Sequence, residues 1–228
     1  LYRRLLVIYE KSIGLSHPIV ATTLHNLALL LMEQRRWSEA EPLLRQALAI
    51  TERVVPPTHH HMWGLLGALA RLVAHLGRRA EEEQLLNRML PIVVFNVGEG
   101  DAMVANTLLR LGECVAEQGR LDEAEMFYRR ALAIDEAAFG EHHFTTVRDL
   151  GWLARTLCDM GRLEEGERMF QRAIEASDIT HGAGYEPVGV LLTERAEALI
   201  ALGRGAEAEP LFHRASGIRG TAPVEAVE

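Results

Sequence analysis

The chain has 228 residues, and its 24 lysines and arginines against 32 acidic residues give a formal net charge of −8. Hydrophobic residues make up 48% of it and charged residues 25%, which predicts a folded globular protein and excludes a disordered one. The acidic balance argues against a general nucleic-acid binder, since no basic field would attract phosphates. No apolar run approaches the ~20 residues of a membrane span. We therefore expect neither nucleic acid nor a membrane as a partner.

Cysteine and lysine usage suggests the setting of the protein. Two cysteines, Cys114 and Cys158, cannot build a disulfide framework, so we expect a reducing, cytoplasmic compartment. Lys11 is the only lysine beside the many arginines, a skew that suggests a bacterial coding sequence of high GC content. Because the sequence opens at Leu1 within an expected helix, we interpret it as a piece of a longer protein.

A 42-residue period runs through the chain without insertion or deletion. It is marked by glycines that are each followed by arginine, at Gly77, Gly119, Gly161 and Gly203, and by a second glycine column at Gly14, Gly98, Gly140 and Gly182. The opening Leu-Tyr-Arg-Arg matches residues 127–130, three periods later. We therefore assign residues 1–13 to the second helix of a truncated leading repeat, 14–216 to five units in one solenoid domain, and 217–228 to a flexible tail.

Each unit is predicted to hold two helices. Apolar residues at helical spacing form one stripe at 24, 27, 28 and 31 and a second at 43, 44, 47 and 48. Ser16 is expected to cap the first helix, with Pro18 in its first turn. Ser38 with Glu41, and Asp122 with Glu125, have capping-box spacing for second helices. The Gly-Arg pairs between the two helices suit a left-handed residue.

These features predict an all-α protein. No segment has the alternating pattern of a strand. One helical hairpin cannot bury its apolar face alone, so successive hairpins must stack into an α-solenoid.

Several stretches resemble kinesin-light-chain-type tetratricopeptide repeats. They are Asn26-Leu27-Ala28, residues 39–43 (Glu-Ala-Glu-Pro-Leu), residues 128–134, and the loop at 14–21. The resemblance covers residues 1–216 and implies a right-handed solenoid whose first helices line a concave groove for extended peptides or partner helices. Two departures stand out: Glu82 occupies a column of small residues, where we expect irregular packing, and Arg195 replaces a leucine in a unit that resembles a polar end cap.

Polar residues on the expected groove face are the candidate binding site. They are His25, Asn26, Arg71, His75, Asn106, Arg110, Arg148 and Arg155. Arginine offers paired donors that suit carboxylates, so these arginines favour an acidic peptide. In the alternative interpretation they pair with nearby acids such as Glu113 and Glu117.

Histidines and cysteine are considered as chemical sites. His59-His60-His61 and His142-His143 fall in inter-unit loops two periods apart, too far for one shared tetrahedral site, so we expect exposed loop histidines and no metal. Cys158 has no evident base, and no phosphate-binding glycine loop is present. We therefore predict no catalysis and no cofactor.

The segment 91–95 (Pro-Ile-Val-Val-Phe) is apolar where the aligned segments are polar. Pro91 should bend or end its helix. Either the segment repacks and buries Val93 and Phe95, or Val93, Val94 and Phe95 form an exposed patch for self-association. The sequence thus predicts a protein-recognition module within a larger scaffold or regulatory protein. The alternative is an oligomerisation module that joins through its ends or this patch.

Overall fold

The computed structural model describes residues 2–12, 14 and 16–220, and within them it contains eleven α-helices and no strand. The helices are α1 (Tyr2–Ser12), α2 (Pro18–Glu33), α3 (Trp37–Val54), α4 (His60–His75), α5 (Arg79–Val97), α6 (Ala102–Ala116), α7 (Leu121–Phe139), α8 (Phe144–Asp159), α9 (Leu163–His181), α10 (Val188–Ala201) and α11 (Gly205–Gly220). The predicted all-α class is confirmed.

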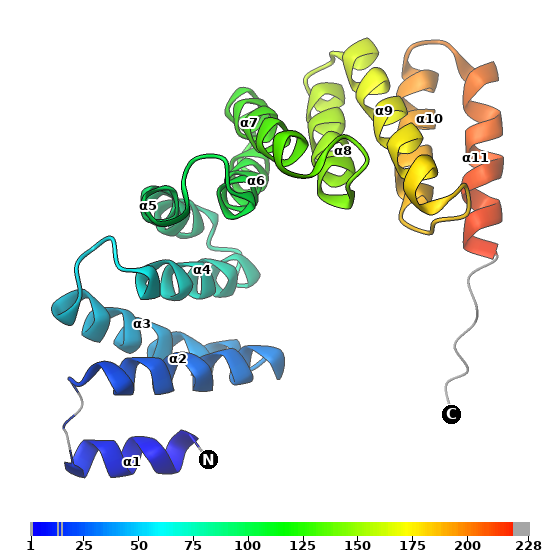
Figure 1. Ribbon diagram of the computed structural model, residues 1–228. Coiled ribbons are helices and arrows are strands. Elements are labelled where there is room, and N and C mark those ends of the chain that lie inside the picture. Colours follow the sequence, from blue (N-terminus) through cyan, green and yellow to red (C-terminus); the bar gives the residue numbers. More distant parts are fainter. Residues whose placement is uncertain (1, 13, 15, 221–228) are drawn as a thin grey trace. The chain divides into compact units, whose positions relative to one another are not determined.

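The chain divides into two compact parts, which we call unit 1 and unit 2 and which each hold several of the 42-residue repeats. The division falls inside α6. Unit 1 ends at Cys114 and contains the hairpins α2–α3 and α4–α5. Unit 2 begins at Val115 and contains the hairpins α8–α9 and α10–α11 (Figure 1). Within each unit the hairpins stack, because α3 packs on α4 in unit 1 and α9 packs on α10 in unit 2. A single domain over residues 14–216 stays a prediction.

The turn inside each hairpin needs a left-handed residue, as the Gly-Arg pairs predict. Gly77, Gly119, Gly161 and Gly203 have φ between 73° and 78°. Arg35 occupies the same repeat position in the α2–α3 turn and is the one non-glycine residue with positive φ among the described residues, at 57°. A side chain at this φ is strained, so this turn keeps the repeat geometry at a cost.

The helix starts differ from the predicted caps. The α2 helix is capped by His17, not Ser16, through its Nδ1, which accepts the Ile19 N–H. At intervals of one period, the same column supplies the caps of α4, α6 and α8, at His59, Asp101 and His143. Histidine Nδ1 here replaces the usual oxygen acceptor.

Arginine precedes each second helix, so the predicted capping boxes are wrong. Ser38 and Asp122 lie inside the first turn, and no side chain caps α3 or α7. The arginine instead pairs with the glutamate three residues later. This glutamate lies in the first turn, near the positive end of the helix dipole, where a carboxylate is favourable. The pairs are Arg36–Glu39, Arg78–Glu81, Arg120–Glu123, Arg162–Glu165 and Arg204–Glu207.

Ion pairs also join second helices of neighbouring hairpins. In unit 1, Arg45 contacts Glu81 at 2.6 Å and Arg88 contacts Glu52 at 2.5 Å, both between α3 and α5. In unit 2, Arg172 contacts Glu136 at 2.6 Å between α7 and α9, and Arg214 contacts Asp178 between α9 and α11. Exposed pairs are individually weak, so these set the alignment of hairpins more than their stability.

The small-residue column lies where the two helices of a hairpin cross. Ala40, Ala124, Gly166 and Ala208 are all buried. Gly166 shows why: an added Cβ would lie 2.4 Å from Cys158 Sγ and 2.9 Å from the Ala154 carbonyl oxygen.

Glu82 lies in the same small-residue column and is only 4% exposed. Its carboxylate contacts Arg79 Nη1 at 2.6 Å and Arg110 Nη2 at 3.4 Å. The glutamate that interrupts this column is therefore buried with its charge compensated.

Two sequence expectations are corrected near residues 91–95 and at the C-terminus. Helix α5 passes through Pro91 and continues to Val97, because Ile92 and Val93 are held in the core. Val93 is 1% exposed, so it cannot belong to a surface patch, whereas Phe95 is 71% exposed and is not buried by repacking.

Helix α11 extends to Gly220 with Ile218 buried, so residues 217–220 are helical. The rest of the predicted tail lies outside the described residues.

Candidate functional site

Unit 2 holds a cavity of about 370 Å³ between the first helices α8 and α10, with α9 and the α9–α10 loop completing its wall. The size falls in the range of ligand pockets. Its walls are mostly apolar and aromatic, with two guanidinium groups among them. The lining residues are Phe144, Val147, Arg148, Gly151, Trp152, Arg155, Ser177, His181, Tyr185, Pro187, Val190 and Leu191.

The predicted groove residues Arg148 and Arg155 therefore line one pocket. The Arg155 guanidinium lies over the Trp152 ring at 4.7 Å, and its Nε donates to Glu194 of α10 at 3.1 Å. Stacking and the ion pair hold the guanidinium in place while 40% of the side chain stays exposed. Arg155 is therefore placed to receive a second carboxylate from a ligand.

Arg148 rests on two buried acids that the sequence analysis missed. Its Nη2 lies 2.9 Å from Asp149 Oδ1 and 3.6 Å from Asp135 Oδ2. Both aspartates are almost fully buried. Burial raises the pKa of Asp149 to about 7, against the lowering effect of Arg148 and with a further rise from Asp135. One arginine thus serves two carboxyl groups, one of which titrates near neutral pH.

The pocket also contains an unpartnered hydroxyl. Ser177 of α9 is fully buried and lines the cavity, and its Oγ has no hydrogen-bond partner. A buried hydroxyl without a partner costs free energy, which a polar ligand atom could recover.

Unit 1 contains a smaller cavity, of about 160 Å³, between α2 and α4. It is lined by Ala21, Thr22, His25, Thr51, His60, His61, Trp63, Gly64 and Leu65. Seven of these residues are three 42-residue periods before a lining residue of the unit 2 pocket. The pairs are 21 with 147, 22 with 148, 25 with 151, 51 with 177, 61 with 187, 64 with 190 and 65 with 191. The two cavities are therefore equivalent sites of the repeat.

The remaining predicted groove residues have varied surroundings. Burial lowers the pKa of His25, and the charges of His61 and Arg71 lower it further. His75 stacks on Trp37 with ring centroids 4.3 Å apart, and Arg110 contacts buried Glu82. Asn26 and Asn106 lie on first helices α2 and α6, outside both cavities.

The histidine runs differ from each other. The side-chain ligand atoms of His59, His60 and His61 lie within 4.8 Å of one another. His143 instead stacks on Phe139, at 4.4 Å between centroids. Burial, then His60 and His59, lower the pKa of His61.

Cys158 is half-buried, and its surroundings disfavour a thiolate. Burial, then Asp159 and Glu194, raise the pKa of its thiol to about 11. An activated cysteine needs the opposite shift, so this geometry does not support a nucleophilic thiol.

Comparison with known proteins identifies the family. Two family models described as tetratricopeptide repeat match residues 20–61 and 103–175, which together make up half of the chain. The chain belongs to the tetratricopeptide-repeat family, as the sequence predicts. Arrays of such repeats generally present extended binding surfaces to other proteins. No curated protein matches the chain in sequence.

Solved structures share the fold at low sequence identity. A putative kinesin light chain repeat protein from Podosopora anserina has a TM-score of 0.78 at 20% identity, covering 92% of this chain and 99% of its own. BtubC (BKLC) from P. vanneervenii has a TM-score of 0.78 at 21% identity, covering 100% and 91%. YrrB, titled a TPR protein with an unusual peptide-binding site, has a TM-score of 0.60 at 13% identity, covering 88% and 87%. Among the described residues, no helix has the length and apolar character to cross a bilayer.

Proposed function

We propose that this chain is a non-catalytic recognition module that binds an acidic peptide or partner helix on its first-helix face. The anchoring site is the unit 2 pocket, which takes one large apolar side chain of the ligand. The observation that carries the proposal is the cavity of about 370 Å³ with aromatic walls and two guanidinium groups.

The pocket has groups that suit both parts of the proposed ligand, its large apolar side chain and its carboxylate. Phe144, Trp152 and Tyr185 offer apolar and aromatic surface, which favours burial of an aromatic or large aliphatic side chain. Arg155 is held against Trp152 and remains partly exposed, which suits a ligand carboxylate next to the buried residue. Because Glu194 already pairs with Arg155, the ligand carboxylate must share or displace it, and this keeps the expected affinity moderate.

A selection from a random 12-residue peptide display library on the immobilised chain tests the proposal. We expect enriched peptides to carry one large apolar residue flanked by Asp or Glu. Their affinity, measured by calorimetry, should fall as salt is raised, because the charged contacts are partly exposed. Enrichment of basic or featureless sequences would contradict the proposal.

A matched pair of variants then locates the contact. Val190 lines the pocket and is 55% exposed, so either charge can be placed there without unfolding α10. Val190→Glu should weaken an acidic peptide at least tenfold, about 1.4 kcal/mol, by desolvation and repulsion. Val190→Lys should retain affinity or improve it. Equal loss in both variants would show that size and not charge decides binding.

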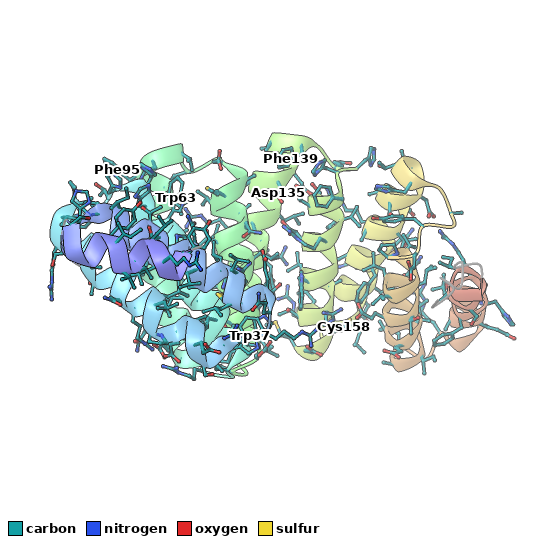
Figure 2. All side chains as sticks on the ribbon, turned by 90° about the horizontal axis from the view of Figure 1, so that it is seen from below. Trp37, Trp63, Phe95, Asp135, Phe139 and Cys158 are labelled. Atoms are coloured by element: carbon teal, nitrogen blue, oxygen red, sulfur yellow. The ribbon has the colours of Figure 1, made fainter. Side chains whose placement is uncertain are left out.

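The alternative function is self-association through Phe95. The apolar surface available for it is small, because Val93 is buried and Val94 is partly buried. Asn96, next to Phe95, donates its side-chain amide to the Thr58 carbonyl oxygen at 2.7 Å, which fixes this end of α5 and leaves Phe95 outward. Figure 2 shows Phe95 and Trp63 toward one edge of unit 1 and Trp37 toward the other. A mass in solution that rises with concentration in wild type, and not in Phe95→Ser, would favour this alternative.

A further inference from the structure

Three histidines gather at the start of α4, although the helix cap needs only one. His59 is the cap: its Nδ1 accepts the His61 N–H at 3.2 Å. His17 and His143 cap α2 and α8 in the same way as single members of the column. At the two positions after the cap, α2 has Pro18 and Ile19, and α8 has Phe144 and Thr145. His60 and His61 are therefore additions that capping does not explain.

The three rings form one cluster on the surface of unit 1. His59 and His60 stack with centroids 4.3 Å apart, and His61 meets them edge-on at 5.1 and 4.4 Å. One ligand nitrogen from each ring lies within 4.8 Å of the others. His60 and His61 are exposed and also line the unit 1 pocket. Both can therefore turn without disturbing the core.

We propose that His59, His60 and His61 form a binding site for a divalent transition-metal ion of the zinc class. Imidazole nitrogens suit Zn²⁺, Ni²⁺ and Cu²⁺, and they exclude hard ions such as Mg²⁺, which need oxygen ligands. Three protein nitrogens leave a fourth tetrahedral position for water or for a group of a bound partner. The run at residues 59–61 supplies three donors by itself, so the site does not need His142 or His143.

The cluster must tighten to hold the ion. Nitrogens that each lie ~2.0–2.1 Å from zinc are about 3.3 Å apart in a tetrahedron, so the rings close by about 1–1.5 Å. His60 and His61 supply most of this motion, because both are exposed whereas His59 is partly buried. For His59 Nε2 to bind the ion, its ring proton moves to Nδ1 and the hydrogen bond from His61 N–H is released. Metal binding therefore competes with the cap, and we expect micromolar affinity.

Calorimetric titration of the chain with ZnCl₂ alone, in a buffer that does not bind metal, tests this site. Wild type should bind one zinc ion with micromolar affinity, and MgCl₂ should give no binding. His60→Asn with His61→Asn should weaken zinc at least tenfold, since it removes two donors and keeps the His59 cap. The matched control is His142→Asn with His143→Asn in unit 2, which should leave zinc affinity unchanged.

A second readout guards against a general surface effect. Trp63 lines the same pocket as His60 and His61, so Cu²⁺ bound at the cluster should quench its fluorescence. Quenching should be lost in the His60/His61 double variant and in Trp63→Phe, with helicity by circular dichroism unchanged. Zinc affinity that is equal in wild type and the His60/His61 variant, or wild type that fails to saturate below 1 mM zinc, would overturn the proposal.

Discussion

The unit 1 and unit 2 pockets lie at equivalent positions of the repeat, but different side chains line them. In unit 1, His25 extends from α2 toward Gly64 of α4, where an added Cβ would lie 3.6 Å from His25 Cε1, and the cavity is about 160 Å³. In unit 2, the position equivalent to His25 is Gly151, and the cavity is about 370 Å³. The hairpin stack makes the cavity, and a few side chains decide whether it is filled by the protein or left for a ligand.

A second difference lies below the unit 2 pocket. Asp149 has Thr23 as its equivalent beside the unit 1 pocket, and Thr23 Oγ1 donates to the Ile19 carbonyl oxygen of its own helix. Asp149 instead shares Arg148 with Asp135, and the nearby Asp135 carboxyl group adds to the rise in the pKa of Asp149. The larger pocket is thus built over a less stable polar core. The following substitutions test this comparison.

Asp149→Asn should have the largest effect, because it removes a charge that burial opposes. The folded pKa of about 7 lies above the unfolded value of 3.8, so ionisation of Asp149 costs stability as pH rises from about 4 to 7, and the cost is complete above pH 7. We expect Asp149→Asn to raise the free energy of unfolding by about 2–4 kcal/mol at pH 8. Urea unfolding at pH 5 and pH 8 measures this, and the gain should be smaller at pH 5. A gain independent of pH would contradict the raised pKa.

Gly166→Ala should destabilise the protein although alanine favours helix. The new Cβ would meet Cys158 Sγ at 2.4 Å and the Ala154 carbonyl oxygen at 2.9 Å, so α8 and α9 must separate. We expect a loss of about 1–3 kcal/mol in unfolding free energy. The equivalent residues Ala40, Ala124 and Ala208 are already alanine, so the cost is specific to the α8–α9 hairpin. Gly166→Ala with Cys158→Ala should recover part of the loss, and unchanged stability in the single variant would show that the helices are not in close contact.

Arg35→Gly should have a smaller effect with the opposite sign. Arg35 has a φ of 57°, while glycine occupies the equivalent turn in unit 2 at Gly161. Replacing Arg35 by glycine relieves the strain of the left-handed conformation. The greater freedom of glycine in the unfolded chain offsets part of this, so we expect the free energy of unfolding to rise by about 0.5–1 kcal/mol. The midpoint of thermal unfolding reports it, with Arg36→Gly as a control that should destabilise by removing the Arg36–Glu39 pair. A destabilised Arg35→Gly would mean that this side chain makes a contact worth more than the strain.

The repeat made most of the fold predictable from sequence. The 42-residue period, the paired helices and the left-handed turns depend on local patterns that recur in each unit, so each was seen several times. The Arg–Glu pairs at each second helix and the His17, His59 and His143 caps were also visible as columns. These columns alone do not predict the contacts, because Ser38 and Asp122 stand at capping spacing and are residue types more common at caps than histidine.

The pocket was less predictable, because it depends on which residues meet across three helices. Phe144, Ser177 and Tyr185 come from α8, α9 and the loop before α10, and periodicity on one helix does not reveal their meeting. The Asp135–Asp149 pair had a signal: Thr51, Val93 and Ser177 fill the Asp135 column, so a carboxylate there is exceptional. Its partner on the next helix could be assigned only in three dimensions.

The three tryptophans provide the most direct test of the central claim. Trp152 lines the unit 2 pocket, Trp63 lines the unit 1 pocket, and Trp37 stacks on His75 outside both. An acidic peptide selected on the chain should, when titrated in a ¹H–¹⁵N spectrum, shift the indole signal of Trp152 with the calorimetric affinity and leave those of Trp63 and Trp37 in place. If binding saturates while the Trp152 signal stays unmoved, the unit 2 pocket is not the recognition site.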